Sequence, residues 1–273
     1  MELPGFPGLP EQEPDVAAIP AFLSAVQARG ADVAINLHGS GWVTNPLVAL
    51  LGARHVAGYH VRGEWLPDPD RFLEHDDRVP EVLRWLRLAS KLGWPSDDAS
   101  LEFPERRPSA AESEIIRQLA GPIAVLHPGA SVAGRRWAPD GFARVGDALA
   151  AAGARIALSG SDAERDVTAA VANAMRATPI DLAGRTSLDG MAALLRYAAV
   201  LVCNDTGVSH LADALGTPSV VLFVDSELER WAPLDRQLHR PIVAGVDGDL
   251  DAATAAALDL LAEHASARSR HAA

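Results

Sequence analysis

The stretch 203–218, CNDTGVSHLADALGTP, decides the fold of this chain. An apolar run at 198–202 precedes it and predicts a buried strand, and a small-residue helix that Gly-Thr-Pro ends follows it. The end of the strand therefore carries Asn204, Asp205, Thr206 and Gly207 to the N-terminus of a helix. In an open α/β sheet, ligands bind at this edge because free N–H groups and the positive end of the helix dipole meet there.

A phosphate group or a polar sugar would suit this position. The simpler alternative is that Asp205 or Thr206 only caps the helix.

Helices and strands alternate regularly from residue 112 onward. Each helix precedes a strand, in the pairs 112–120 and 123–127, 139–152 and 155–159, 162–176 and 180–182, 187–198 and 199–203, 207–215 and 219–224. This alternation predicts a parallel sheet with helices on both faces and right-handed crossovers.

The first hundred residues give a weaker pattern. Helices are expected near 19–29, 45–52 and 80–93, and only 33–37 and 56–59 are convincing strands. Residues 94–111, rich in proline, serine and charge, predict a linker. We therefore expect a partial N-terminal domain at 1–105, a complete Rossmann-like domain at 112–240 and a C-terminal helix at 250–265.

The charge balance limits the classes of partner. The chain has 36 acidic and 24 basic residues and a net charge of -12, which argues against nucleic acid and against an anionic membrane as the primary ligand, although a local basic spot can still exist. A single cysteine fits a reducing compartment. No apolar run is long enough for a membrane span and no signal peptide pattern begins the chain, so we predict a soluble cytoplasmic protein.

Several common sites are missing from the sequence. No strand is followed by G-x-G-x-x-G, and neither a P-loop nor a G-x-S-x-G elbow occurs. Neither a Cys/His spacing for zinc nor a D-x-D pair is found. We therefore expect neither a bound cofactor nor a metal site.

Further loops accompany the deciding stretch: HPGAS at 127–131, GRRWAP at 134–139, GSDAE at 160–164 and LAGRTSL at 182–188. This order of motifs resembles the C-terminal half of glycosyltransferase family 9, the family of the ADP-heptose:lipopolysaccharide heptosyltransferases. The resemblance covers roughly residues 30 to 235, with its specific motifs after residue 120.

The resemblance implies an α/β fold of the GT-B type, with two Rossmann-like domains and parallel sheets. Family members open with a strand, a glycine-containing loop and a nearby aspartate that serves as general base, and this chain starts after that point. The N-terminal domain is therefore expected to be incomplete. Either the start is misassigned or the gene is truncated, or the chain is complete and uses another base.

The same resemblance suggests which residues hold a nucleotide-sugar donor. A basic residue in the loop after 127–131 contacts the diphosphate in the family, and Arg135 and Arg136 bring bidentate positive charge there. Glu164 resembles a carboxylate that binds the ribose, although it equally suits a helix dipole. The full donor-binding set is Gly129, Ser131, Arg135, Arg136, Glu164, Asp205, Thr206, Gly207 and His210.

The expected reaction is transfer of a heptose-like sugar, with inversion, from an ADP-linked donor to a hydroxyl of a glycan or glycolipid acceptor. Donor and acceptor are the expected partners, with no nucleic acid and at most peripheral membrane contact. His38 is the candidate general base, although it also suits a residue that structures the turn 38–41. Two alternatives stay open: a nucleotide-sugar epimerase of the same fold, and a catalytically impaired protein that only binds nucleotide sugars.

Overall fold

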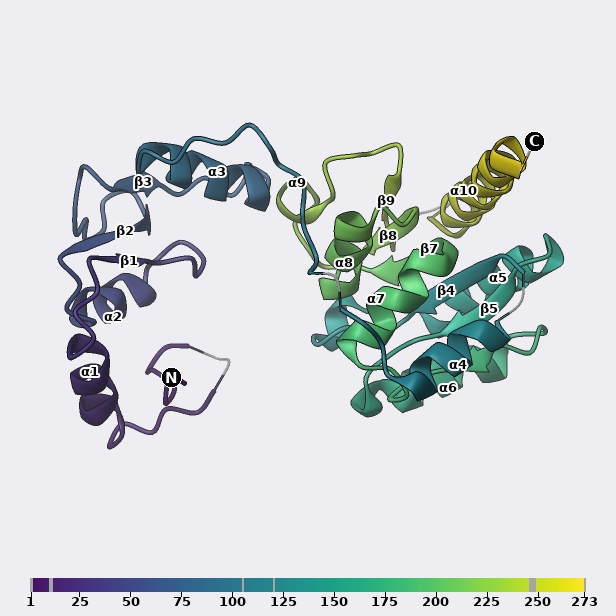
Figure 1. Cartoon of the computed structure of the whole chain (residues 1–273), viewed down its shortest axis with the longest axis horizontal. Coiled ribbons are helices and arrows are strands. Elements are labelled where there is room, and N and C mark those ends of the chain that lie inside the picture. The colour runs from purple at the N-terminus through teal and green to yellow at the C-terminus, as the bar shows by residue number, and fades with distance from the viewer. Residues whose placement is uncertain (1, 10–11, 105, 120, 246–248, 273) are drawn as a thin grey trace. The chain divides into compact units, whose positions relative to one another are not determined.

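A computed structural model describes residues 2–9, 12–104, 106–119, 121–245 and 249–272. The chain separates into two compact units, Met1–Ala99 and Ser100–Ala273, each built from helices and parallel strands (Figure 1). The predicted α/β class with parallel sheets is therefore confirmed. The exact domain limits expected from the sequence stay predictions.

The smaller unit contains a three-stranded parallel sheet in the order β1-β2-β3. Its elements are α1 (Ile19–Gln27), β1 (Val33–Ile35), α2 (Thr44–Leu50), β2 (His55–His60), β3 (Phe72–Glu74) and α3 (Glu81–Lys91). The sequence indicated only two strands here. It missed β3 because that strand has three residues, of which only Phe72 is buried, and this is too short for an alternating pattern.

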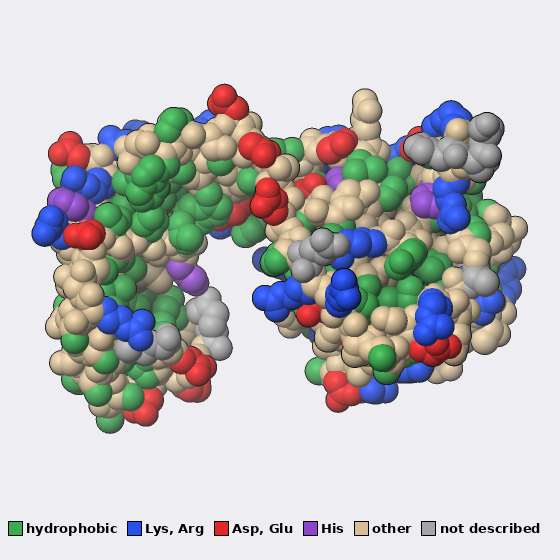
Figure 2. All heavy atoms as spheres, in the orientation of Figure 1, with side chains coloured by type: hydrophobic (Ala, Val, Ile, Leu, Met, Phe, Trp, Pro, Cys, Tyr) green, Lys and Arg blue, Asp and Glu red, His purple; other side chains and the backbone are tan. Residues whose placement is uncertain are grey.

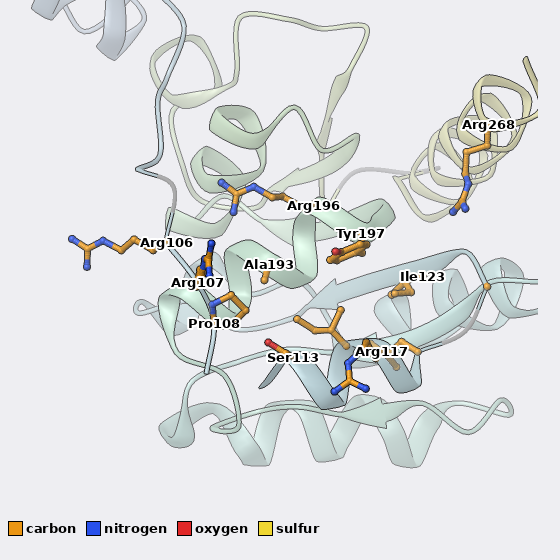
Figure 3. A pocket seen from close by; sticks show the side chains of 13 residues that line it. Arg106, Arg107, Pro108, Ser113, Arg117, Ile123, Ala193, Arg196, Tyr197 and Arg268 are labelled. Atoms are coloured by element: carbon orange, nitrogen blue, oxygen red, sulfur yellow. The ribbon is translucent and has the colours of Figure 1, made fainter. Parts of the chain in front are cut away.

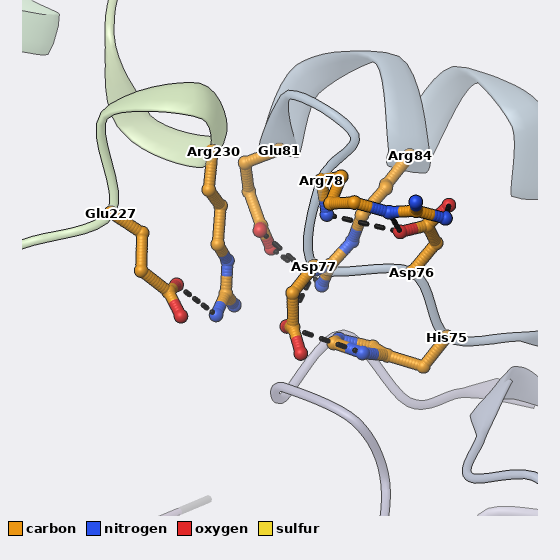
Figure 4. A network of polar contacts seen from close by, with 8 residues as sticks. All are labelled: His75, Asp76, Asp77, Arg78, Glu81, Arg84, Glu227 and Arg230. Atoms are coloured by element: carbon orange, nitrogen blue, oxygen red, sulfur yellow. Dashed lines mark hydrogen bonds and ion pairs between the residues drawn. The ribbon is translucent and has the colours of Figure 1, made fainter.

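A buried arginine ties α3 to β2 in this unit. The side chain of Arg84 is 1% exposed, and it lies 3.3 Å from Glu81 and 4.0 Å from Asp77 (Figure 4). Its guanidinium carbon is 5.4 Å from the centre of the Tyr59 ring, and the Tyr59 hydroxyl donates to the Arg84 carbonyl. Burial raises the pKa of Tyr59, which keeps this hydroxyl a donor.

The larger unit contains six parallel strands in the order β6-β5-β4-β7-β8-β9. Its elements are α4 (Ala110–Gln118), β4 (Ile123–His127), η1 (Ala133–Arg135), α5 (Pro139–Ala151), β5 (Arg155–Leu158), η2 (Asp162–Glu164), α6 (Arg165–Ala174), β6 (Ile180–Asp181), α7 (Leu188–Tyr197), β7 (Ala198–Asn204), α8 (Gly207–Leu215), β8 (Ser219–Phe223), α9 (Leu228–Trp231), β9 (His239–Val243) and α10 (Asp249–Ala272). The sequence did not indicate α9 or β9.

Helices cover both faces of this sheet. Alternate strand residues such as Leu126 and Val202 pack with α5, α6 and α10 on one face, whereas Val125 and Leu201 pack with α4, α7 and α8 on the other. Because both faces are covered, β4, β7 and β8 are buried along their whole length, as parallel strands in such folds are. The strand order reverses between β4 and β7, which places a topological switch point there.

The last helix, α10, completes the first of these faces. Its residues 253, 256, 257, 260 and 261 are all part of the same apolar core as α5. At its start, Asp249 Oδ2 accepts a hydrogen bond of 3.1 Å from Trp137 Nε1, which lies 112 positions earlier. Within the described residues, every helix is too short or too polar to cross a membrane.

Candidate functional site

The loops after β4 and β7 meet at the switch point and are joined by Asn204. This residue is fully buried, and its Nδ2 donates to the carbonyls of Pro128 and Gly129 at 2.9 and 3.2 Å. Its Oδ1 accepts from the backbone N–H of Trp137 at 2.9 Å. One amide side chain therefore fixes the end of β7 to the Pro-Gly turn and to the segment that enters α5. The sequence placed Asn204 at this edge of the sheet but not in the donor-binding set, because its contacts join loops that lie far apart along the chain.

Glu164 lies against this turn from the end of β5. Its Oε2 accepts from the backbone N–H and the hydroxyl of Ser161, both at 2.8 Å. Its Oε1 faces Gly129, where a Cβ atom would lie only 2.2 Å away. The structure therefore brings the predicted residues Gly129 and Glu164 together, and it leaves one carboxylate oxygen directed at the turn.

The charge of Glu164 follows from its surroundings. Burial raises its pKa, but the hydrogen bonds from Ser161 and the positive charge of Arg136 outweigh burial and hold the pKa below its usual value. His127 is buried, with its Nδ1 2.9 Å from Ser159 Oγ. Burial lowers the pKa of His127, against the opposing effect of Glu164. At neutral pH the site therefore holds an ionised carboxylate beside a neutral imidazole.

The two predicted arginines differ in their contacts. Arg136 donates from Nε and Nη2 to the Ala130 carbonyl at 2.9 and 2.7 Å, so its guanidinium braces the loop. Arg135 is half-buried, and among the described residues its guanidinium has no hydrogen-bond or ion-pair partner. Ser131 is exposed on the same loop. Of the two arginines, Arg135 is the one whose charge is left for a ligand.

Thr206 stands at the N-cap position of α8 without capping it. Its Oγ1 is buried and has no hydrogen-bond partner within the described part of the chain. Asp205 beside it is 5% exposed, and a Cβ atom on Gly207 would meet nothing within 4 Å. The N-terminus of α8 thus offers an unpaired hydroxyl next to open space. A buried polar group without a partner carries a desolvation cost that a ligand could remove.

His210 has a different environment from that of Thr206. Its ring packs against Trp231 of α9, with the ring centroids 6.1 Å apart. The sequence could not show this aromatic contact, because it did not indicate α9. A role for His210 in ligand binding stays a prediction.

His38 lies in the smaller unit, exposed on the loop after β1. Asn36 organises this loop: its Oδ1 accepts from the His38 backbone N–H at 3.0 Å, and its Nδ2 donates to Thr44 Oγ1 and Asn45 Oδ1 at 2.7 and 2.6 Å. The buried amide therefore holds the turn, and the role of the His38 imidazole as a base stays a prediction. Among the described residues, no three histidine, cysteine or acidic side chains gather as metal ligands would.

A family model and curated relatives both match this chain to the heptosyltransferases. The model of glycosyltransferase family 9 (heptosyltransferase) matches residues 19–243. Lipopolysaccharide heptosyltransferase 2 of Salmonella typhimurium is 28% identical over 207 residues, which are 73% of this chain and 57% of that protein. The chain spans about half the length of the curated relatives it matches.

Two solved structures share the fold. A glycosyltransferase family 9 protein of Veillonella parvula has a TM-score of 0.68 at 20% identity, covering 91% of this chain and 79% of that one. The ADP-heptose heptosyltransferase II of Escherichia coli has a TM-score of 0.67 at 22% identity, covering 91% and 82%.

Proposed function

We propose, from the premise that this chain belongs to glycosyltransferase family 9, that it transfers a heptose-like sugar from a nucleoside diphosphate to a hydroxyl of a glycan or glycolipid acceptor. The observation that carries the proposal is the buried, unpaired Thr206 hydroxyl at the N-terminus of α8, beside the switch point of the sheet. A ligand at this edge would supply the missing hydrogen-bond partner.

The diphosphate of the donor is proposed to lie at the N-terminus of α8. The free N–H groups of the first helical turn and the Thr206 hydroxyl donate to phosphate oxygens, and the helix dipole favours their charge. Arg135 adds a guanidinium that can bind a phosphate in a bidentate manner. Open space at Gly207 allows close approach of the ligand. These donors stabilise the leaving nucleoside diphosphate in place of a metal ion.

The ribose of the donor is proposed to bind Glu164. Because hydrogen bonds and nearby positive charge keep this carboxylate ionised, its Oε1 can accept from a sugar hydroxyl. Adenine is the proposed base, supported by the ADP-heptose specificity in the name of the Escherichia coli relative.

The chemical step is proposed to be a direct displacement. The acceptor oxygen forms a bond to the anomeric carbon as the bond to the diphosphate oxygen breaks, and this inverts the configuration. The acceptor proton moves to a general base, for which we propose His38.

The test begins with calorimetric titration of the whole chain with ADP, UDP and GDP. We expect ADP to bind, and we expect Arg135→Ala and Thr206→Val each to weaken binding about tenfold, the effect of losing one charge-assisted or one buried hydrogen bond. Arg144→Ala, an exposed arginine on α5, is the matched control and should bind as the wild type does. Equal affinity for all variants would contradict the assigned site.

Turnover is measured next, with ADP-heptose and an oligosaccharide acceptor from lipopolysaccharide. If His38→Ala abolishes transfer and leaves ADP binding unchanged, the result supports His38 as the general base. Full transfer by that variant contradicts the assignment. Binding without any transfer would favour a protein that only binds nucleotide sugars.

A further inference from the structure

The larger unit has a hollow at the amino edge of its sheet, opposite the switch point. It has a volume of about 1000 Å³ and lies where β4 begins at Ile123 and where α7 ends at Tyr197. The segment before α4, α4 itself and α10 contribute the other walls (Figure 3). We call this hollow the basic groove. None of the proposed donor-site residues lines it.

Among the residues that the structure describes, five arginines and no acidic residue line the basic groove: Arg106, Arg107, Arg117, Arg196 and Arg268. This is unexpected in a chain whose acidic residues outnumber its basic ones by 36 to 24. Within the described residues, only Arg117 of the five has a carboxylate partner, Glu114 on the same helix. The local field at the groove is therefore positive although the chain as a whole is negative.

Helix dipoles account for part of this cluster. Arg117 and Arg196 stand in the last turns of α4 and α7, where a positive charge stabilises a helix end. Arg106, Arg107 and Arg268 do not occupy such positions: the first two precede α4 and the third lies within α10. Three of the five charges therefore do not serve to stabilise a helix end.

An exposed aromatic ring lies among these charges. Tyr197 is 65% exposed, an unusual exposure for the last residue of a helix whose preceding residues 190–195 are buried. Figure 3 shows its ring between Arg196 and the Arg268 side chain that descends from α10. Figure 2 shows basic side chains around an apolar patch on this face of the larger unit. Tyrosine and clustered basic residues are both found where protein surfaces meet lipid headgroups.

We propose that the basic groove docks this unit on an anionic phospholipid surface. The five guanidinium groups come from four separate segments and do not converge on one point, since Arg106 points away from the others (Figure 3). Guanidinium groups spaced in this way can pair with several phosphate groups on a surface, whereas one small anion could not contact all of them. The net charge of -12 does not prevent this docking. At physiological salt, charges more than about 8 Å from the membrane are largely screened, whereas the arginines of the groove would touch the phosphates directly. The proposal does not depend on glycosyl transfer.

The test is co-flotation of the whole chain with vesicles of phosphatidylcholine, alone or mixed with phosphatidylglycerol. We expect binding to the mixed vesicles only, with loss at high salt. The double variant Arg107→Gln/Arg196→Gln should bind about 30-fold more weakly, because each basic residue near such a surface contributes about fivefold. The control Arg144→Gln/Arg165→Gln removes equal charge from α5 and α6 and should bind nearly as well as the wild type.

Other outcomes overturn the proposal. They are equal binding by the two double variants, equal binding to both vesicle types, and displacement of the chain from vesicles by millimolar inorganic phosphate, which would make the groove a site for small anions. Self-association in sedimentation without lipid, lost in the groove variant alone, would assign the groove to a second copy of the chain. Thermal unfolding and ADP titration of each variant confirm that the unit is intact.

Discussion

The carboxylate of Glu164 lies so close to the backbone of Gly129 that a Cβ atom on the glycine would be 2.2 Å from Oε1 and 2.4 Å from Cδ. Gly129 does not have a positive φ, so space and not backbone conformation demands glycine there. The two residues come from the ends of neighbouring strands, β4 and β5. The Glu164 carboxylate can therefore occupy its position only because residue 129 of the turn has no side chain.

Gly129→Ala should lower the free energy of unfolding by about 1–3 kcal/mol, because the methyl group displaces Glu164 and strains the turn. In a Glu164→Ala background the same substitution should cost much less. Urea unfolding of the four proteins gives the coupling directly. Gly207→Ala, whose Cβ meets nothing within 4 Å, is the control and should be nearly neutral. An equal cost of Gly129→Ala in both backgrounds would contradict the steric explanation.

Thr206→Val should have opposite effects on stability and on binding. Valine keeps the shape of threonine but removes a buried hydroxyl that lacks a partner among the described residues, so the free protein should be as stable or about 1 kcal/mol more stable. ADP should nevertheless stabilise the variant less than the wild type. Thermal unfolding with and without ADP measures both effects. A clear loss of stability without ligand would show that the hydroxyl is already satisfied.

Asn204→Asp should strongly destabilise the larger unit, although it only replaces the side-chain nitrogen with an oxygen. A carboxylate cannot donate to the carbonyls of Pro128 and Gly129, and a buried charge would face two acceptors. We expect a loss of about 3 kcal/mol of unfolding free energy and loss of ADP binding. Asn173→Asp, exposed on α6, makes the same change as a control. If the two variants unfold at the same urea concentration, the Asn204 side chain does not hold the two loops together.

Glu112 should make the larger unit sensitive to acid. Hydrogen bonds from Ser109, and then from Ser187, lower its pKa from 4.5 to about 2. Because this pKa is lower in the folded than in the unfolded chain, the stabilisation is complete above about pH 4.5 and disappears as the pH falls toward 2. Glu112→Gln should therefore cost on the order of 2 kcal/mol at pH 7 and much less near pH 2.

Urea unfolding of Glu112→Gln at several pH values tests this, with Glu102→Gln, an exposed position, as the control. If the loss of unfolding free energy in Glu112→Gln does not change with pH, the ionised Glu112 carboxylate is not the source of the stabilisation.

The sequence predicted the centre of the larger sheet well and its margins poorly. The predicted limits of β4 and α8 agree with the structure, because β4 is a continuous apolar run and Gly216 ends α8 in a left-handed conformation with a φ of 64°. The edge strand β9 was missed because Pro241 interrupts it, and proline is tolerated only at such an edge.

For the site, the sequence indicated the correct loops but not the contacts between them. Arg135 and Arg136 look equivalent along the chain, and only the structure shows that Arg136 is bound to the Ala130 carbonyl. The approach of Glu164 to Gly129 likewise joins residues on different strands, which no local pattern reveals.

The contribution of α10 to the core has a consequence for the order of synthesis. Trp137 is made long before its partner Asp249, and at about 5–20 residues per second the ribosome takes roughly 6–22 s to cover the 112 positions between them. During that interval the part of the α5 surface that α10 covers in the folded unit stays exposed, because residues 253–261 do not yet exist. The nascent larger unit is therefore open to aggregation or to chaperone binding until its final helix has been translated.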